Sequence, residues 1–333
     1  MKAIRFFFLA LLLFQFSCKS QNRKLNGVSF VASRDTISHE TIKPLLATNT
    51  NTVALMPFAF VRGVNSPNVI YSQQRQWFGE TPNGIIQYAK AFNAKNISIM
   101  LKPQLWVSRG EFTGYIEMKN EEDWKTLENS YADFILLFAK IAADINAEIF
   151  CIGTELEKFI LNRPDYWRNL ISKIRKVYKG KLTYAANWDE FKRVPFWDVL
   201  DFIGVDAYFP LSDKKTPSIS DLEQGWQEHK KTIITLKDKY KKPVLFTEFG
   251  YRSVDFTGKE PWKTDRMEGN VNLIAQTNAL KAIHNQFWKE EWFAGGYVWK
   301  WFVKHNRVGG ENNNRFTPQN KPSEKLLKEL YAN

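Results

Sequence analysis

The chain has 333 residues, of which 44% are hydrophobic and 25% charged, and its formal net charge is +12 at pH 7. This length suits one large domain of the size of an α/β barrel, and the composition is that of a globular protein rather than a disordered one. Basic residues are interleaved with acidic ones and form no basic block, so we expect no nucleic-acid partner.

The first residues have the pattern of a bacterial export signal. An apolar run at 6–14 is too short to span a bilayer as a mature helix, and Ser17 directly precedes Cys18. A small residue before a cysteine is typical of lipoprotein processing. We therefore expect residues 1–17 to be a signal peptide, Cys18 to carry lipid, and 18–26 to tether the protein outside the cytoplasm, at the outer membrane or cell surface. The alternative is an ordinary cleaved signal with an incidental cysteine.

After this tether, apolar runs of strand length alternate with amphipathic stretches of helix length up to the end of the chain. That order predicts a parallel sheet. The predicted strands are 27–32, 52–57, 98–102, 148–153, 182–186, 202–205, 244–247 and 296–299. The predicted helices begin at 81–82 or cover 121–145, 164–178, 218–240, 270–288 and 322–331.

Eight strands with intervening helices predict a single (β/α)8 TIM barrel, class α/β, over residues 27–333. The helix at 121–145 has one apolar stripe at three- and four-residue spacing, which should face the core. Longer loops follow the strands, whereas the returns from helix to strand are shorter. Barrel enzymes keep their active sites at the C-terminal ends of the strands, so we expect the site on that face. Cys151 lies inside an apolar run and is predicted to be a buried hydrophobe.

Two glutamates end apolar strands in this scheme. Glu155 follows the fourth strand and Glu248 ends the seventh, so both should face the same opening. Two carboxyl groups about 5 to 5.5 Å apart are what a retaining glycosidase needs, with one as acid/base and one as nucleophile.

The chain also resembles the clan of retaining glycoside hydrolases with (β/α)8 barrels, clan A, and most closely glycoside hydrolase family 113. The resemblance is carried by Met-Leu-Lys-Pro-Gln at 100–104, Ile-Gly-Thr-Glu-Leu at 152–156, Asp-Phe-Ile-Gly-Val-Asp-Ala-Tyr-Phe-Pro-Leu at 201–211, Phe-Thr-Glu-Phe-Gly-Tyr at 246–251 and Tyr-Val-Trp-Lys-Trp at 297–301. These segments occur in order at strand ends. The resemblance implies hydrolysis of β-1,4-linked mannan.

Carried over by the resemblance, Glu155 is the acid/base and Glu248 the nucleophile, and Tyr208 matches the tyrosine that hydrogen-bonds the nucleophile. One position departs from the clan. Many members have asparagine before the acid/base, in contact with the sugar 2-hydroxyl, and here Thr154 stands there. A threonine hydroxyl is shorter and lacks the paired amide groups, so the preferred sugar is open.

Sugar rings stack on flat apolar surfaces and need polar partners for their hydroxyls. Aromatic residues make up 15% of the chain, and several tryptophans fall on the predicted active face: Trp77, Trp106, Trp188, Trp299 and Trp301. Core packing is the alternative for each of them. The predicted polar contacts are Lys102, Gln104, Asn187 and Asp206. A structural ion pair is the alternative for Lys102.

Other chemistries lack their motifs. The four histidines have no metal-ligand spacing, and neither a nucleophile elbow nor a phosphate or dinucleotide loop is present, so we expect no metal and no cofactor. We therefore predict a monomeric, lipid-anchored retaining glycoside hydrolase acting on β-1,4-linked mannan or manno-oligosaccharides. The alternatives are a hydrolase of another β-glycan, such as a glucan, and a non-catalytic glycan-binding lipoprotein.

Overall fold

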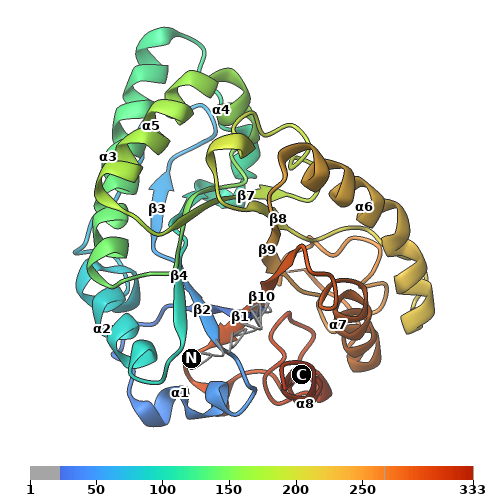
Figure 1. Cartoon of the computed structure of the whole chain (residues 1–333). Coiled ribbons are helices and arrows are strands. Elements are labelled where there is room, and N and C mark those ends of the chain that lie inside the picture. Colours follow the sequence, from blue (N-terminus) through green and yellow to red (C-terminus); the bar gives the residue numbers. More distant parts are fainter. Residues whose placement is uncertain (1–22, 266, 333) are drawn as a thin grey trace, which may run out of the picture.

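The computed structural model describes residues 23–265 and 267–332. Eight parallel strands form a closed barrel in the order β1-β10-β9-β8-β7-β6-β4-β2 (Figure 1). Their bounds are β1 Leu25–Val31, β2 Thr52–Leu55, β4 Ser98–Leu101, β6 Ile149–Thr154, β7 Lys181–Asn187, β8 Ile203–Asp206, β9 Val244–Phe249 and β10 Phe293–Phe302. Each overlaps a strand expected from the sequence, so the TIM-barrel prediction is confirmed.

Helices surround the barrel (Figure 1). They are α1 His39–Leu46, α2 Pro82–Asn93, α3 Glu121–Asp144, α4 Glu157–Asn162, α5 Pro164–Val177, α6 Ile219–Tyr240, α7 Leu273–Phe287 and α8 Pro322–Leu330. Between β7 and β8 the described chain has only a 3-10 turn, at Trp197–Val199. Side-chain caps begin several helices: Asn120 accepts from Asp123 N at the start of α3, and Ser218 and Asp221 form a capping box at α6.

The core has two layers. An inner cluster draws residues from strands all around the barrel, including Ala54, Met100, Leu245 and Tyr297, and so fills the barrel interior. An outer cluster joins the strands to the helices and includes the predicted apolar stripe of α3, whose members are all buried. Cys151 is fully buried in the inner cluster, as the sequence predicts.

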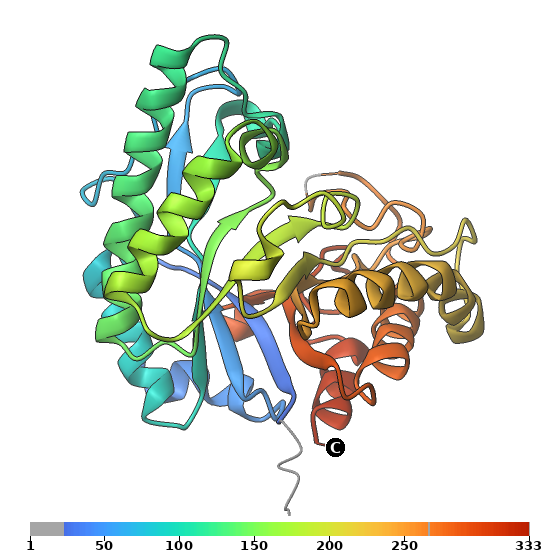
Figure 2. The same cartoon turned by 45° about the horizontal axis from the view of Figure 1, so that its top comes forward.

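Two further strands lie outside the barrel. β3 (Phe58–Val61) and β5 (Gln104–Val107) pair in parallel as a separate two-stranded sheet. They follow β2 and β4 directly and therefore stand at the C-terminal end of the barrel. Figure 2 shows β3 and the long helix α3 extending above one side of the barrel. The mouth of the barrel thus has a taller wall on the side of β2 and β4.

Candidate active site

Glu248 lies on β9 at the C-terminal end of the barrel, and both of its carboxylate oxygens accept hydrogen bonds. Lys102 Nζ lies 2.5 Å from Oε1, and Gln104 Nε2 donates to the same oxygen at 3.0 Å. Tyr208 donates its hydroxyl to Oε2 at 2.9 Å. Glu248 is only 7% exposed. Three donors, one of them a cation, hold this carboxyl group in a fixed orientation.

Lys102 also pairs with Asp206, at 3.2 Å. Both side chains are fully buried, and Thr247 Oγ1 donates to Asp206 at 2.7 Å. Burial alone would lower the pKa of Lys102, but the charges of Asp206 and Glu248 outweigh burial and raise it above its ordinary value. Lys102 is therefore a permanent buried cation between two carboxylates. The structure shows the alternative named for Lys102, a structural ion pair, and this ion pair includes Glu248.

Glu155 follows β6 directly, and its environment differs from that of Glu248. Burial, and then the charges of Asp206 and Glu248, raise its pKa well above the usual range. No described residue donates a hydrogen bond to its carboxyl group. A carboxylic acid in such surroundings keeps its proton at neutral pH and can donate it.

The backbone of Glu155 is held in an unusual conformation, with φ of 51° in the left-handed region. Its amide donates to Ala185 O at 2.8 Å, and its carbonyl accepts from Thr113 Oγ1 at 2.9 Å. The next amide, of Leu156, donates to Tyr184 OH at 2.6 Å. A left-handed non-glycine residue fixed on both sides is typical of a functional site.

Sequence reasoning did not find Glu190 and Tyr184, which support this turn. Tyr184 donates its hydroxyl to Glu190 Oε1 at 2.6 Å, and Glu190 Oε2 accepts from Asn187 N at 2.9 Å. Glu190 is fully buried, and burial raises its pKa to about 8. The only signal in the sequence is an acidic residue shortly after a strand, in a loop where such residues are common.

The remaining predicted contacts are placed as follows. Asn187 and Trp188 end β7 and begin the next loop, and the Trp188 ring stacks on Trp262 with centroids 5.3 Å apart. Trp106 is exposed on β5 and Trp299 is half-buried on β10. The Thr154 hydroxyl is buried and has no hydrogen-bond partner in the described part of the chain.

The prediction that Trp301 contacts sugar is wrong. Its side chain is 1% exposed and packs in the outer core, 5.6 Å from the ring of His305. The cause is an extra residue in β10. Val28 and Phe30 of β1 pair with Val298 and Trp301, so two residues of β10 stand opposite one of β1 and the alternation of faces is broken.

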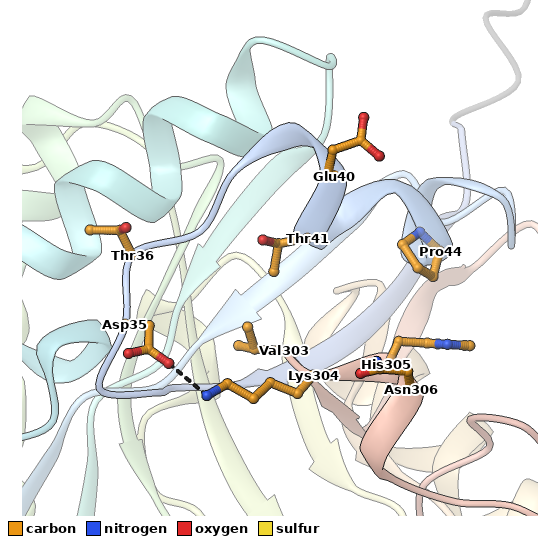
Figure 3. A pocket seen from close by; sticks show the side chains of 9 residues that line it. All are labelled: Asp35, Thr36, Glu40, Thr41, Pro44, Val303, Lys304, His305 and Asn306. Carbon is orange, nitrogen blue, oxygen red and sulfur yellow. Dashed lines mark ion pairs between the residues drawn. The ribbon is translucent and has the colours of Figure 1, made fainter.

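A cavity of about 400 Å³ opens beside the barrel mouth, between the segments that follow β1 and β10 (Figure 3). Asp35 and Lys304 form an ion pair of 2.8 Å across it. Its described lining includes no tryptophan, tyrosine or phenylalanine, and it includes neither Glu155 nor Glu248. It therefore offers no stacking surface for a sugar ring, and we place the candidate site at Glu155 and Glu248.

The model of glycoside hydrolase family 113 matches residues 31–321 of the chain. The chain belongs to glycoside hydrolase family 113. The family and clan predicted from the strand-end segments are confirmed, and the protein is a glycoside hydrolase. A sequence comparison with curated proteins gave no match.

Solved structures of family 113 share the fold. A complex of a family 113 β-1,4-mannanase has 22% sequence identity and a TM-score of 0.80, covering 93% of this chain and 99% of that one. The β-mannanase AaManA from Alicyclobacillus acidocaldarius, in complex with ManMIm, has 24% identity and a TM-score of 0.82, covering 93% and 97%. A Faecalibacterium prausnitzii β-glucuronidase is more distant, with 13% identity, a TM-score of 0.57, and coverage of 93% and 49%.

The family 113 protein has no group of three or more metal-ligating side chains among the residues that the structure describes. Within the same residues no helix has the length and hydrophobicity needed to cross a membrane. The predicted signal peptide and the lipidation site Cys18 lie outside the described residues.

Proposed function

We propose that this family 113 protein is a retaining hydrolase of β-1,4-linked mannan or manno-oligosaccharides, with Glu248 as nucleophile and Glu155 as acid/base. The opposite environments of two glutamates at one barrel mouth support this assignment most directly. Glu248 accepts hydrogen bonds from Lys102, Gln104 and Tyr208, which stabilise the negative charge that a nucleophile needs. Glu155 is protonated because burial and neighbouring carboxylates raise its pKa. Double displacement needs one glutamate as a carboxylate nucleophile and the other as a protonated acid.

In the first step, Glu248 attacks the anomeric carbon while the bond to the leaving oxygen breaks, and Glu155 gives its proton to that oxygen. A covalent glycosyl-enzyme forms. In the second step, water attacks the same carbon, Glu155 takes the proton from the water, and Glu248 leaves as a carboxylate. The product keeps the β configuration because the carbon is inverted twice.

Mannan comes first among β-glycans because the two most similar structures described above are of β-mannanases, over nearly their whole length. The test is a panel of β-mannan, β-glucan, xylan and galactan, with the anomer of each product followed by NMR. We expect β-mannose ends from mannan. Release of sugar from another glycan and not from mannan would show that mannan is not the substrate. A product with the α configuration would contradict the retaining mechanism.

Variants of the two glutamates test their roles. We expect Glu248→Ala to lose turnover and to keep glycan binding. Glu155→Ala should lose roughly 10²- to 10⁴-fold with poor leaving groups and much less with activated aryl glycosides, which need no proton. Azide should rescue Glu155→Ala with a β-glycosyl azide as product. If both variants respond alike to the leaving group, the assignment of roles fails.

We further propose that the protein is exported and anchored through lipid on Cys18. The support is the sequence pattern before that residue. Expression with labelled palmitate, and separation of membranes from soluble fractions, tests this proposal. Wild type should be labelled and sediment with membranes, whereas Cys18→Ser should carry no label. An unlabelled wild-type protein would leave an ordinary cleaved signal as the explanation.

A further inference from the structure

The small sheet of β3 and β5 has one buried face and one open face. Ala59, Val61, Leu105 and Val107 are buried in the outer core. Side chains alternate along a strand, so Phe58, Phe60, Gln104 and Trp106 share the opposite face. Phe58 pairs with Gln104, and Phe60 with Trp106.

This open face begins at the candidate nucleophile. Gln104 donates to Glu248 Oε1 at 3.0 Å, so the face containing Gln104 is turned toward the barrel mouth. Trp106 stands two residues farther along the same strand, a distance of roughly 6.6 Å and of the order of one sugar unit. The face therefore leads outward from the bond to be cleaved.

Three apolar side chains form a row across this outer part, which we call the Trp106 row: Ile70, Phe60 and Trp106. Ile70 and Phe60 exchange two backbone hydrogen bonds of 2.8 Å, and Phe60 is the register partner of Trp106. The three side chains are 40%, 42% and 39% exposed. Paired residues on adjacent strands lie side by side, so the row presents a continuous apolar surface to solvent.

We propose that the Trp106 row is a subsite that binds a sugar of a β-linked glycan chain beyond the bond being cleaved. The proposal rests on the proposed function. A glycan is the occupant for two reasons. The row continues the face of β5 from which Gln104 donates to Glu248. A pyranose also stacks its C–H face on exposed aromatic rings. The sequence did not point to Phe60 and Ile70, because the predicted strand ends at residue 57 and β3 was not predicted.

The test compares wild type with Trp106→Ala and Phe60→Ala on manno-oligosaccharides of increasing length. A lost aromatic anchor should lower kcat/KM about five- to thirty-fold more on long chains than on the shortest cleaved substrate, mainly through KM. Trp106→Tyr keeps an aromatic ring, so it should lose much less kcat/KM on long chains than Trp106→Ala does. Tyr240→Ala, a partly exposed tyrosine near the C-terminal end of α6, at the opposite end of the barrel, is the matched control and should show no dependence on length.

Equal losses at all lengths, or none, would overturn the proposal. Thermal unfolding of each variant separates misfolding from lost binding. If wild type cleaves another β-glycan and not mannan, the same length series is run on that glycan. The subsite is then tested even though the proposed substrate is wrong. If wild type cleaves nothing, retardation in gels containing soluble mannan or glucan replaces kinetics, and unchanged retardation of Trp106→Ala refutes the subsite. The subsite is also refuted if variants of the Trp106 row lose binding to a protein partner while their glycan binding stays unchanged.

Discussion

At the scale of single residues, the site depends on how Glu248 is held. Lys102 and Gln104 bind one carboxylate oxygen, and Tyr208 binds the other. Burial, and then the charge of Glu248, raise the pKa of Tyr208 well above its usual value. The hydroxyl therefore stays protonated and remains a donor to the carboxylate. Loss of this single bond leaves the two on the other oxygen in place.

Tyr208→Phe should accordingly keep the fold and lose rate. A hydrogen bond to a charged group is worth about 1.5–3 kcal/mol, which corresponds to roughly a 10- to 150-fold loss of kcat. Tyr178→Phe is the control, because its hydroxyl donates at 2.7 Å to the Ala147 carbonyl, near the N-terminal start of β6. Both variants are measured for kcat and for thermal stability. Equal activity of Tyr208→Phe and wild type would show that the bond has no role in the reaction.

The sequence identifies only part of this site, for a physical reason. Glu155 and Glu248 end apolar strands, and such a position fixes which end of the barrel a side chain reaches. Tyr184 and Glu190 act through a hydrogen bond between a strand and a loop. No periodicity records that contact, so it is visible only once the chain is folded.

At the scale of elements, the sequence predicted all eight barrel strands, because each is an apolar run separated from the next by a helix or a turn. It missed the four-residue strands β3 and β5, which begin just after the predicted strands 52–57 and 98–102 end. It also took Trp301 for a cleft residue, since strict alternation ignores the extra residue in β10. Short strands and bulges depend on pairing partners, which a single sequence does not contain.

Helix α6 passes unusually close to the loop that follows β8. A Cβ on Gly225 would lie 2.1 Å from the Leu211 carbonyl oxygen, so only glycine allows this approach. In an ordinary helix, replacing glycine by alanine is stabilising by about 1 kcal/mol. Here the sign should reverse, because the helix or the loop that carries Tyr208 must move.

We expect Gly225→Ala to lower the free energy of unfolding by about 1–3 kcal/mol. Urea denaturation followed by circular dichroism measures it. Gln224→Ala is the matched control on the same helix, at an exposed side chain, and should be neutral or slightly stabilising. A stabilised Gly225→Ala would mean that α6 and the loop are farther apart than the structure places them.

At the scale of the whole molecule, the barrel mouth concentrates buried acids, and this affects stability. The pKa values of Glu155 and Asp206 are raised by burial and by neighbouring carboxylates, and that of Glu190 is raised to about 8 by burial. A raised carboxyl pKa means that the folded state binds more protons than the unfolded state. Such a group contributes its whole stabilisation at pH values below its pKa in the unfolded state. This contribution is lost as the pH rises through its pKa in the folded state.

Lys321 limits the range of pH in which this effect can be read. Burial lowers its pKa to about 7, so the unfolded state binds more protons than the folded state between about pH 7 and 10. Its contribution to stability therefore increases with pH over that range, whereas the contribution of the carboxyl groups decreases. Below pH 7 the lysine is mostly protonated in both states. Burial also lowers the pKa of His284 to about 4, so this histidine opposes the acids up to about pH 6.5, but it is one group against several carboxyl groups.

We therefore expect the free energy of unfolding to fall as pH rises from about 5 to 7, and Glu190→Gln to make this fall shallower. Glutamine mimics the protonated acid between Tyr184 and Asn187, so the folded variant no longer has to release a proton there. Urea denaturation at several pH values measures both slopes. Glu311→Gln, at an exposed side chain, is the control and should keep the wild-type slope. A Glu190→Gln slope equal to the wild type would show that Glu190 is ionised in the folded protein over this whole range, with its charge stabilised by the two donors.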